Sequence, residues 1–240
     1  MKNITQLIGR KEWYLFTIVA AFVSLHLLYI NTPFVNLEWV YRQGSQYFLT
    51  HDTELLKQYF LLQANPLQYS FLSSLIVNLF GDHYASYRVL ALLGGTLVLI
   101  MLIKYKEPYL LLIVGLNPLI WIYSGRGHSE LLSVGIMLLA IGLQKRGVLS
   151  GIFAGLAASI KYHSIILSGA YFSLLWLKDY FKSRTISFKD NRLISIFVSS
   201  VLLLTYLILY YQWFDIWIVP DWAHKVINRQ DLTYIRIQNL

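Results

Sequence analysis

Long hydrophobic runs separated by short polar stretches make up most of this chain. Few charged residues interrupt the runs at residues 13–30, 84–103, 109–124, 129–144, 148–160, 164–177 and 193–213. Most of these runs approach the roughly 20 residues that an α-helix needs to cross a bilayer. The pattern predicts an all-α polytopic membrane protein with about seven transmembrane helices.

The first long polar interval, residues 31–83, has a helical pattern of its own. Residues 37–49 and 54–62 place apolar side chains at helical spacing, with aromatic residues among them, and Pro66 opens a third segment at 67–80. Such amphipathic segments lie in the membrane–water interface, where Trp and Tyr rings gather. We therefore expect residues 1–213 to form one module whose first outer loop carries juxtamembrane helices, with residues 214–240 as a short extracytoplasmic tail.

Charge sets the orientation of these runs. The chain is 57% hydrophobic and 13% charged, against about a quarter charged in soluble domains. Most of its net charge of +8 lies in short loops between the runs, which is the positive-inside pattern rather than a nucleic-acid surface. We expect a multi-pass protein of the cell membrane with a cytoplasmic N-terminus. Without cysteine, disulfides, thiolate chemistry and Cys-ligated metals are excluded.

Several ionisable or polar groups follow directly after the runs, on the side that this topology makes extracytoplasmic. Because such groups are costly at membrane depth, they suggest a functional site. Simpler explanations remain open: a carboxylate favours a helix N-terminus, and a lysine at a helix end can reach to the interface. The groups are Glu38, Asn65, the turn at residues 125–130, Lys161 and His163.

The order of these features resembles the membrane glycosyltransferases of the GT-C fold, in the branch that contains protein O-mannosyltransferases and lipid A aminoarabinose transferases. The resemblance covers about residues 10–215 and rests on several short matches taken together. They are Glu38 and Tyr41 after the first run, the box at residues 65–69, Leu79-Phe80-Gly81, Arg88, Asn117-Pro118, Glu130 and Lys161.

The resemblance implies an enzyme that moves a sugar from a polyprenyl-phosphate donor to a glycan, lipid or protein acceptor. It assigns Glu38 as the general base, which accepts the acceptor's proton. Cationic side chains then stabilise the departing phosphate; Lys161 and Arg126 are the candidates, with Arg88 a weaker one. Glu130, with His128 or His163, is expected to bind a divalent metal ion or to orient the acceptor. Further substrate contacts are expected from Tyr41, Arg42 and Asn65.

Two other classes of function stay open. A transporter or flippase of a lipid-linked sugar would require inverted repeats and interrupted helices at mid-membrane depth, whereas the ionisable groups here cluster at one rim. A non-catalytic or partner-dependent membrane subunit is the second alternative. Relatives usually continue past the seventh helix, so the resemblance also suggests a truncated member that works with a partner subunit.

Overall fold

The computed structural model describes residues 13–34, 38–62, 66–104, 113–114, 117–183 and 190–214. Within these ranges the chain is helical and has no strand, which confirms the all-α prediction. The helices are α2 (Trp13–Tyr29), α3 (Glu38–Thr50), α4 (Thr53–Leu62), α5 (Gln68–Phe80), α6 (Tyr84–Lys104), α8 (Pro118–Ser124), α9 (Glu130–Gly142), α10 (Gly147–Ile160), α11 (His163–Ser183) and α12 (Asn191–Phe214).

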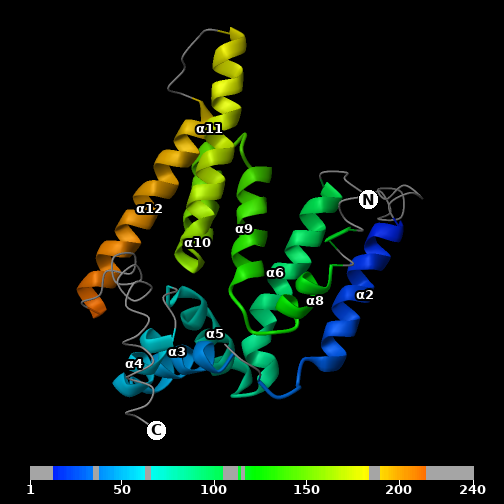
Figure 1. Ribbon diagram of the computed structural model, residues 1–240, viewed down its shortest axis with the longest axis vertical. Coiled ribbons are helices and arrows are strands. Elements are labelled where there is room, and N and C mark those ends of the chain that lie inside the picture. The colour runs from blue at the N-terminus through cyan, green and yellow to red at the C-terminus, as the bar shows by residue number, and fades with distance from the viewer. Residues whose placement is uncertain are drawn as a thin grey trace, which may run out of the picture.

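The longer helices stand in a splayed row, and the short helices α3, α4 and α5 lie across one end of it (Figure 1). α9 packs against α6 on one side and α10 on the other, while α10 packs against α12. α6 and α9 start at the α3–α5 end, and α10 finishes there (Figure 1). The chain therefore brings several helix ends and their connecting turns together beside the short helices.

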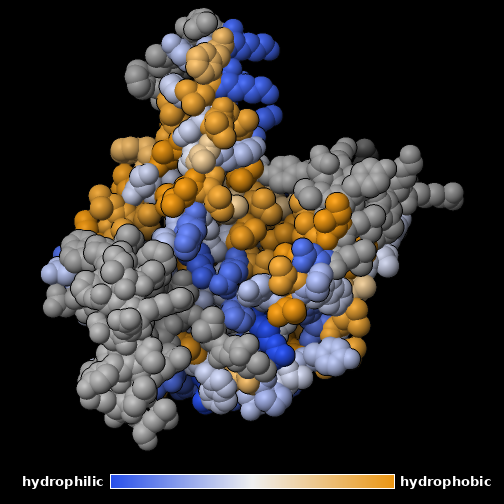
Figure 2. All heavy atoms as spheres, in the orientation of Figure 1, coloured by the Kyte–Doolittle hydropathy of each residue, from blue (hydrophilic) through white to orange (hydrophobic). Residues whose placement is uncertain are grey.

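Two described helices, Tyr84–Lys104 and Asn191–Trp213, are long and apolar enough to cross a bilayer. Phe16–Tyr29, α9 and α10 are apolar but shorter. In Figure 2, hydrophobic atoms cover much of the long helices, and a more hydrophilic band lies toward the α3–α5 end. The predicted number of seven spans stays a prediction.

The three predicted amphipathic segments fold close to where the hydrophobic pattern placed them. Residues 37–49, 54–62 and 67–80 correspond to α3, α4 and α5. The prediction of one continuous helix over 109–124 is wrong, because Asn117 is extended and caps a new helix by accepting a hydrogen bond from the Leu119 amide at 2.9 Å. Pro118, which has no amide hydrogen to donate, suits the first position of that helix.

Glycines let the central helices approach closely. Three of them lie along one face of α10 against α12, and a methyl group on Gly151 would come within 2.8 Å of the Ser195 carbonyl oxygen. Gly94 of α6 and Gly135 of α9 meet in the same way, and a Cβ on Gly135 would lie 2.8 Å from the Gly94 carbonyl oxygen. These contacts fix the spacing of the helices whose ends form the candidate site.

Candidate functional site

The centre of the α3–α5 end is a buried ion pair between Glu38 and Arg88. The Arg88 Nε donates to Glu38 Oε1 at 2.7 Å and its Nη2 donates to Oε2 at 3.0 Å. Neither side chain has exposed surface. Arg88 also donates to the carbonyl oxygens of Ile30, Thr32 and Pro33, so one guanidinium joins the segment after α2 to α3 and α6.

The turn between α8 and α9 closes onto the same carboxylate. The Gly127 amide donates to Glu38 Oε1 at 2.8 Å, and Arg126 Nη1 lies 3.5 Å from Oε2. A side chain at position 127 would approach the Tyr87 carbonyl oxygen at 3.0 Å, which explains the small residue there. Glu38 thereby holds the turn in place.

A second charged cluster lies beside this turn. Lys161 Nζ is 2.8 Å from Glu130 Oε1, and His128 Nδ1 is 3.7 Å from Glu130 Oε2. Glu130 occupies the first turn of α9, and Lys161 caps the end of α10, so the pair joins two helix ends. His128 Nδ1 and Glu130 Oε2 are both buried and have no hydrogen-bond partner.

His128 connects the two clusters. Burial lowers its pKa, Glu130 and Glu38 oppose that shift, and the positive charges of Lys161 and Arg126 add to it. Each of these four groups is therefore close enough to act on the imidazole. The hydroxyl of Tyr41 lies 2.8 Å from that of Ser129 and so joins α3 to the same turn.

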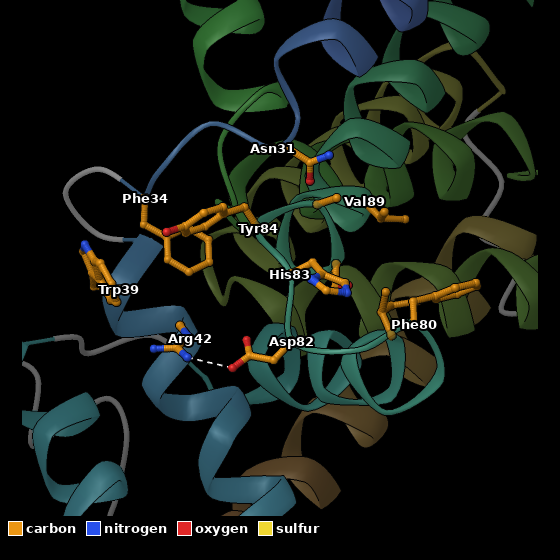
Figure 3. A pocket seen from close by; sticks show the side chains of 12 residues that line it. Asn31, Phe34, Trp39, Arg42, Phe80, Asp82, His83, Tyr84 and Val89 are labelled. Carbon is orange, nitrogen blue, oxygen red and sulfur yellow. Dashed lines mark hydrogen bonds and ion pairs between the residues drawn. The ribbon is translucent and has the colours of Figure 1, made fainter.

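Most of the predicted site residues meet here, and two of the described ones, His163 and Arg42, do not contribute. The residues that meet are Glu38, Tyr41, Arg88, Arg126, His128, Glu130 and Lys161. His163 is exposed and its ring stacks on that of Tyr162. Arg42 points to a separate cavity, where it pairs with Asp82 at 2.7 Å (Figure 3). Asn65 lies outside the described residues.

The geometry does not favour the expected roles of Glu38 and Arg88. A general base must reach the substrate's proton, but Glu38 is buried and both of its oxygens already accept hydrogen bonds from Arg88. Arg88 is committed to Glu38 and to three carbonyl oxygens, so it is not free for a phosphate. Both act as positioning residues that hold the turn next to Glu130.

A metal site at Glu130 and His128 gains no support. Within the described ranges, no group of three or more His, Asp or Glu side chains is arranged so that it could hold a metal ion. The Lys161 ammonium also lies on Glu130 Oε1, where its positive charge opposes a second cation.

Several residues of the site had no signal that singled them out in the sequence. The Ser133 hydroxyl, one turn after Glu130, donates to the Ala157 carbonyl oxygen at 2.8 Å and also contacts the Ser164 hydroxyl. This joins α9, α10 and α11 just behind Lys161. Serines are common in apolar helices and carry no spacing motif, so only coordinates reveal this contact.

The burial of His128 predicts sensitivity to acid. Its folded pKa lies below its ordinary value of 6.5, so the unfolded chain binds more protons below that pH and folding loses stability as the pH falls. Thermal unfolding from pH 7.5 to 5 should show a smaller acid-induced loss for His128→Gln than for the native protein. Equal losses in both proteins would contradict a lowered pKa of His128 in the folded protein.

Comparison with known proteins adds no relative to this picture: no family model, no curated protein and no solved structure matches the chain. The site is therefore interpreted from its own residues and geometry.

Proposed function

We propose that this protein is a membrane glycosyltransferase that moves a sugar from a polyprenyl-phosphate donor to an acceptor on the extracytoplasmic face. The observation that carries the proposal is the meeting of Lys161, Arg126, Glu130 and His128 around one turn. The resemblance to GT-C enzymes supports the class of reaction.

Two cations are placed to receive the donor phosphate. Lys161 is partly exposed and Arg126 is a third exposed, whereas Arg88 behind them is buried. As the bond between the anomeric carbon and the phosphate oxygen breaks, its electron pair leaves with the phosphate. Positioned cations stabilise the charge that grows there, which lowers the barrier.

Glu130 takes the role of general base in this proposal. Its side chain is partly exposed, while Glu38 is sealed. When the donor phosphate draws Lys161 away, Glu130 becomes free to accept the proton of the acceptor hydroxyl. The acceptor oxygen then bonds to the anomeric carbon on the face opposite the departing phosphate. The neutral imidazole of His128 lies beside the Glu130 carboxylate and can share the proton that Glu130 takes from the acceptor.

The proposed orientation places this site outside the cell. The charged cluster lies where α9 starts and α10 finishes. This is the end of the molecule opposite the beginning of α2 (Figure 1). With a cytoplasmic N-terminus and about seven spans, that end faces the outer leaflet, where polyprenyl-phosphate sugars would be accessible.

The test is transfer of a radiolabelled sugar from a polyprenyl-phosphate donor by the purified full chain. Lys161→Ala and Glu130→Gln should each lower turnover by about 10²-fold, because each removes a group that acts in the transition state. Lys182→Ala is the matched control, since Lys182 is an exposed lysine in the last turn of α11. Native turnover in both site variants would rule out the mechanism.

A further inference from the structure

A separate cavity of about 940 Å³ lies on the other side of the Glu38–Arg88 pair. It is lined by the segment after α2, one face of α3, the end of α5 and the start of α6 (Figure 3). Its lining residues are Asn31, Phe34, Trp39, Arg42, Ile76, Phe80, Asp82, His83, Tyr84, Ala85, Ser86 and Val89. The transferase chemistry proposed above does not use them.

Aromatic rings form one part of the wall. Phe34 packs edge-on against Trp39 and Tyr84, at ring-centre distances of 5.2 and 4.7 Å. Phe34 is buried and fixes the two outer rings, while Trp39 remains 48% exposed. In Figure 3, Trp39, Phe34 and Tyr84 lie along the same side of the cavity. Ring surface is thus available to a ligand.

An anchored ion pair forms another part of the wall. Arg42 Nη2 donates to Asp82 Oδ2 at 2.7 Å, and the Tyr87 hydroxyl donates to Asp82 Oδ1 at 2.8 Å. Gln46 in turn donates to the Tyr87 hydroxyl at 2.7 Å. The hydrogen bond from Arg42 lowers the pKa of Asp82, which keeps the carboxylate ionised. The two charges neutralise each other and leave oriented polar atoms without a net charge.

Backbone geometry sets the position of Asp82. Gly81 has a φ of +90°, a conformation that glycine adopts without strain. The Ser86 hydroxyl donates to the Gly81 carbonyl oxygen at 2.8 Å and holds the loop against α6. Asp82 and His83 are thereby presented to the cavity from a fixed turn.

We propose that this cavity binds a neutral saccharide and, on the basis of the proposed transferase function, that this saccharide is part of the acceptor. A sugar ring offers an apolar face to aromatic rings and hydroxyl groups to fixed polar atoms, which matches both parts of the wall. A phosphate would meet no net positive charge here, because Asp82 already neutralises Arg42. A hydrocarbon chain would displace water from Arg42 and Asp82 and could not replace the hydrogen bonds that water makes to these side chains.

The position of the cavity agrees with an acceptor site. The Phe34 ring lies 5.6 Å from the guanidinium of Arg88. Trp39 directly follows Glu38 in α3. The buried ion pair therefore forms a partition between the saccharide cavity and the charged cluster around Glu130. For transfer, the end of an acceptor chain held in the cavity would have to pass around this partition.

The test is binding of neutral oligosaccharides to the full chain in nanodiscs, using a panel of gluco-, galacto- and manno-configured oligomers. Trp39→Ala should weaken binding of the best ligand by about tenfold or more. Trp13→Ala is the matched control, because Trp13 is 50% exposed at the far end of α2. Asp82→Ala provides a second variant that removes polar wall atoms, and thermal unfolding checks that every variant is folded.

The outcomes separate this inference from the proposed function. Weaker binding in Trp39→Ala and Asp82→Ala, with native binding in Trp13→Ala, would support the saccharide site. Native binding in both cavity variants, or no binding by any oligosaccharide of the panel, would overturn it. So would displacement of the oligosaccharide by added phospholipid, which would identify the cavity as a lipid site. Lys161→Ala should still bind the saccharide, because Lys161 does not line the cavity. Saccharide binding is thus measured independently of sugar transfer, and a failed transfer assay would count against the proposed function alone.

Discussion

Replacing Arg88 with methionine is expected to lower the free energy of unfolding by about 3–5 kcal/mol. The substitution removes two hydrogen bonds from the buried Glu38 carboxylate, whose other contacts include the Gly127 amide and the more distant Arg126. A buried charge that loses its ion-pair partner is among the most destabilising single changes. Denaturant or thermal unfolding in detergent micelles, followed by circular dichroism, would measure the loss.

The double variant Glu38→Gln/Arg88→Met is the control for this prediction. It removes both charges, and the glutamine side chain can still accept the Gly127 hydrogen bond. Replacing both partners of a buried ion pair often costs far less than replacing one. The double variant should therefore be more stable than Arg88→Met. An Arg88→Met protein as stable as the native one would show that the pair does not hold the helices together.

The second large effect is expected from Gly94→Ala, which should destabilise the protein by about 3 kcal/mol. A Cβ at this position would lie 2.5 Å from the Leu131 carbonyl carbon and would also meet the Leu132 backbone. Backbone atoms cannot rotate away as a flexible side chain can, so α6 and α9 would have to separate. The same unfolding measurement reports the loss.

Gly169→Ala supplies the matched control for Gly94→Ala. Gly169 is also helical, in α11, and a Cβ there meets no atom within 4 Å. Because alanine favours the helix over glycine, this variant should be unchanged or more stable by about 0.5–1 kcal/mol. Similar effects of the two substitutions would contradict a tight crossing between α6 and α9.

Much of the fold follows from hydrophobic spacing, because that spacing decides which segments form helices and where they end. The amphipathic segments became α3, α4 and α5 near their expected bounds. The error at residues 109–124 came from giving continuous hydrophobicity more weight than the Asn117-Pro118 pair. An asparagine followed by proline is a recognised helix start, and here it begins α8.

The site was only partly predictable, since the sequence shows which charges lie at the ends of apolar segments but not the partner of each charge. Arg42 lies one helical turn after Glu38, so spacing alone would allow them to pair. In the structure Glu38 faces inward to Arg88, while Arg42 faces outward to Asp82. Which charges pair depends on the rotation of α3 against α6, and no local pattern encodes that rotation.

The buried ion pair also imposes an order on biosynthesis. Glu38 leaves the ribosome 50 residues before Arg88 and 89 residues before Gly127. At about 5–20 residues per second, its carboxylate must wait roughly 3–10 s for Arg88. During that interval the carboxylate lacks Arg88, which disfavours burial of the segment around Glu38, so this segment would stay hydrated until α6 has emerged. Synthesis and final assembly of the N-terminal part are therefore separate events in time.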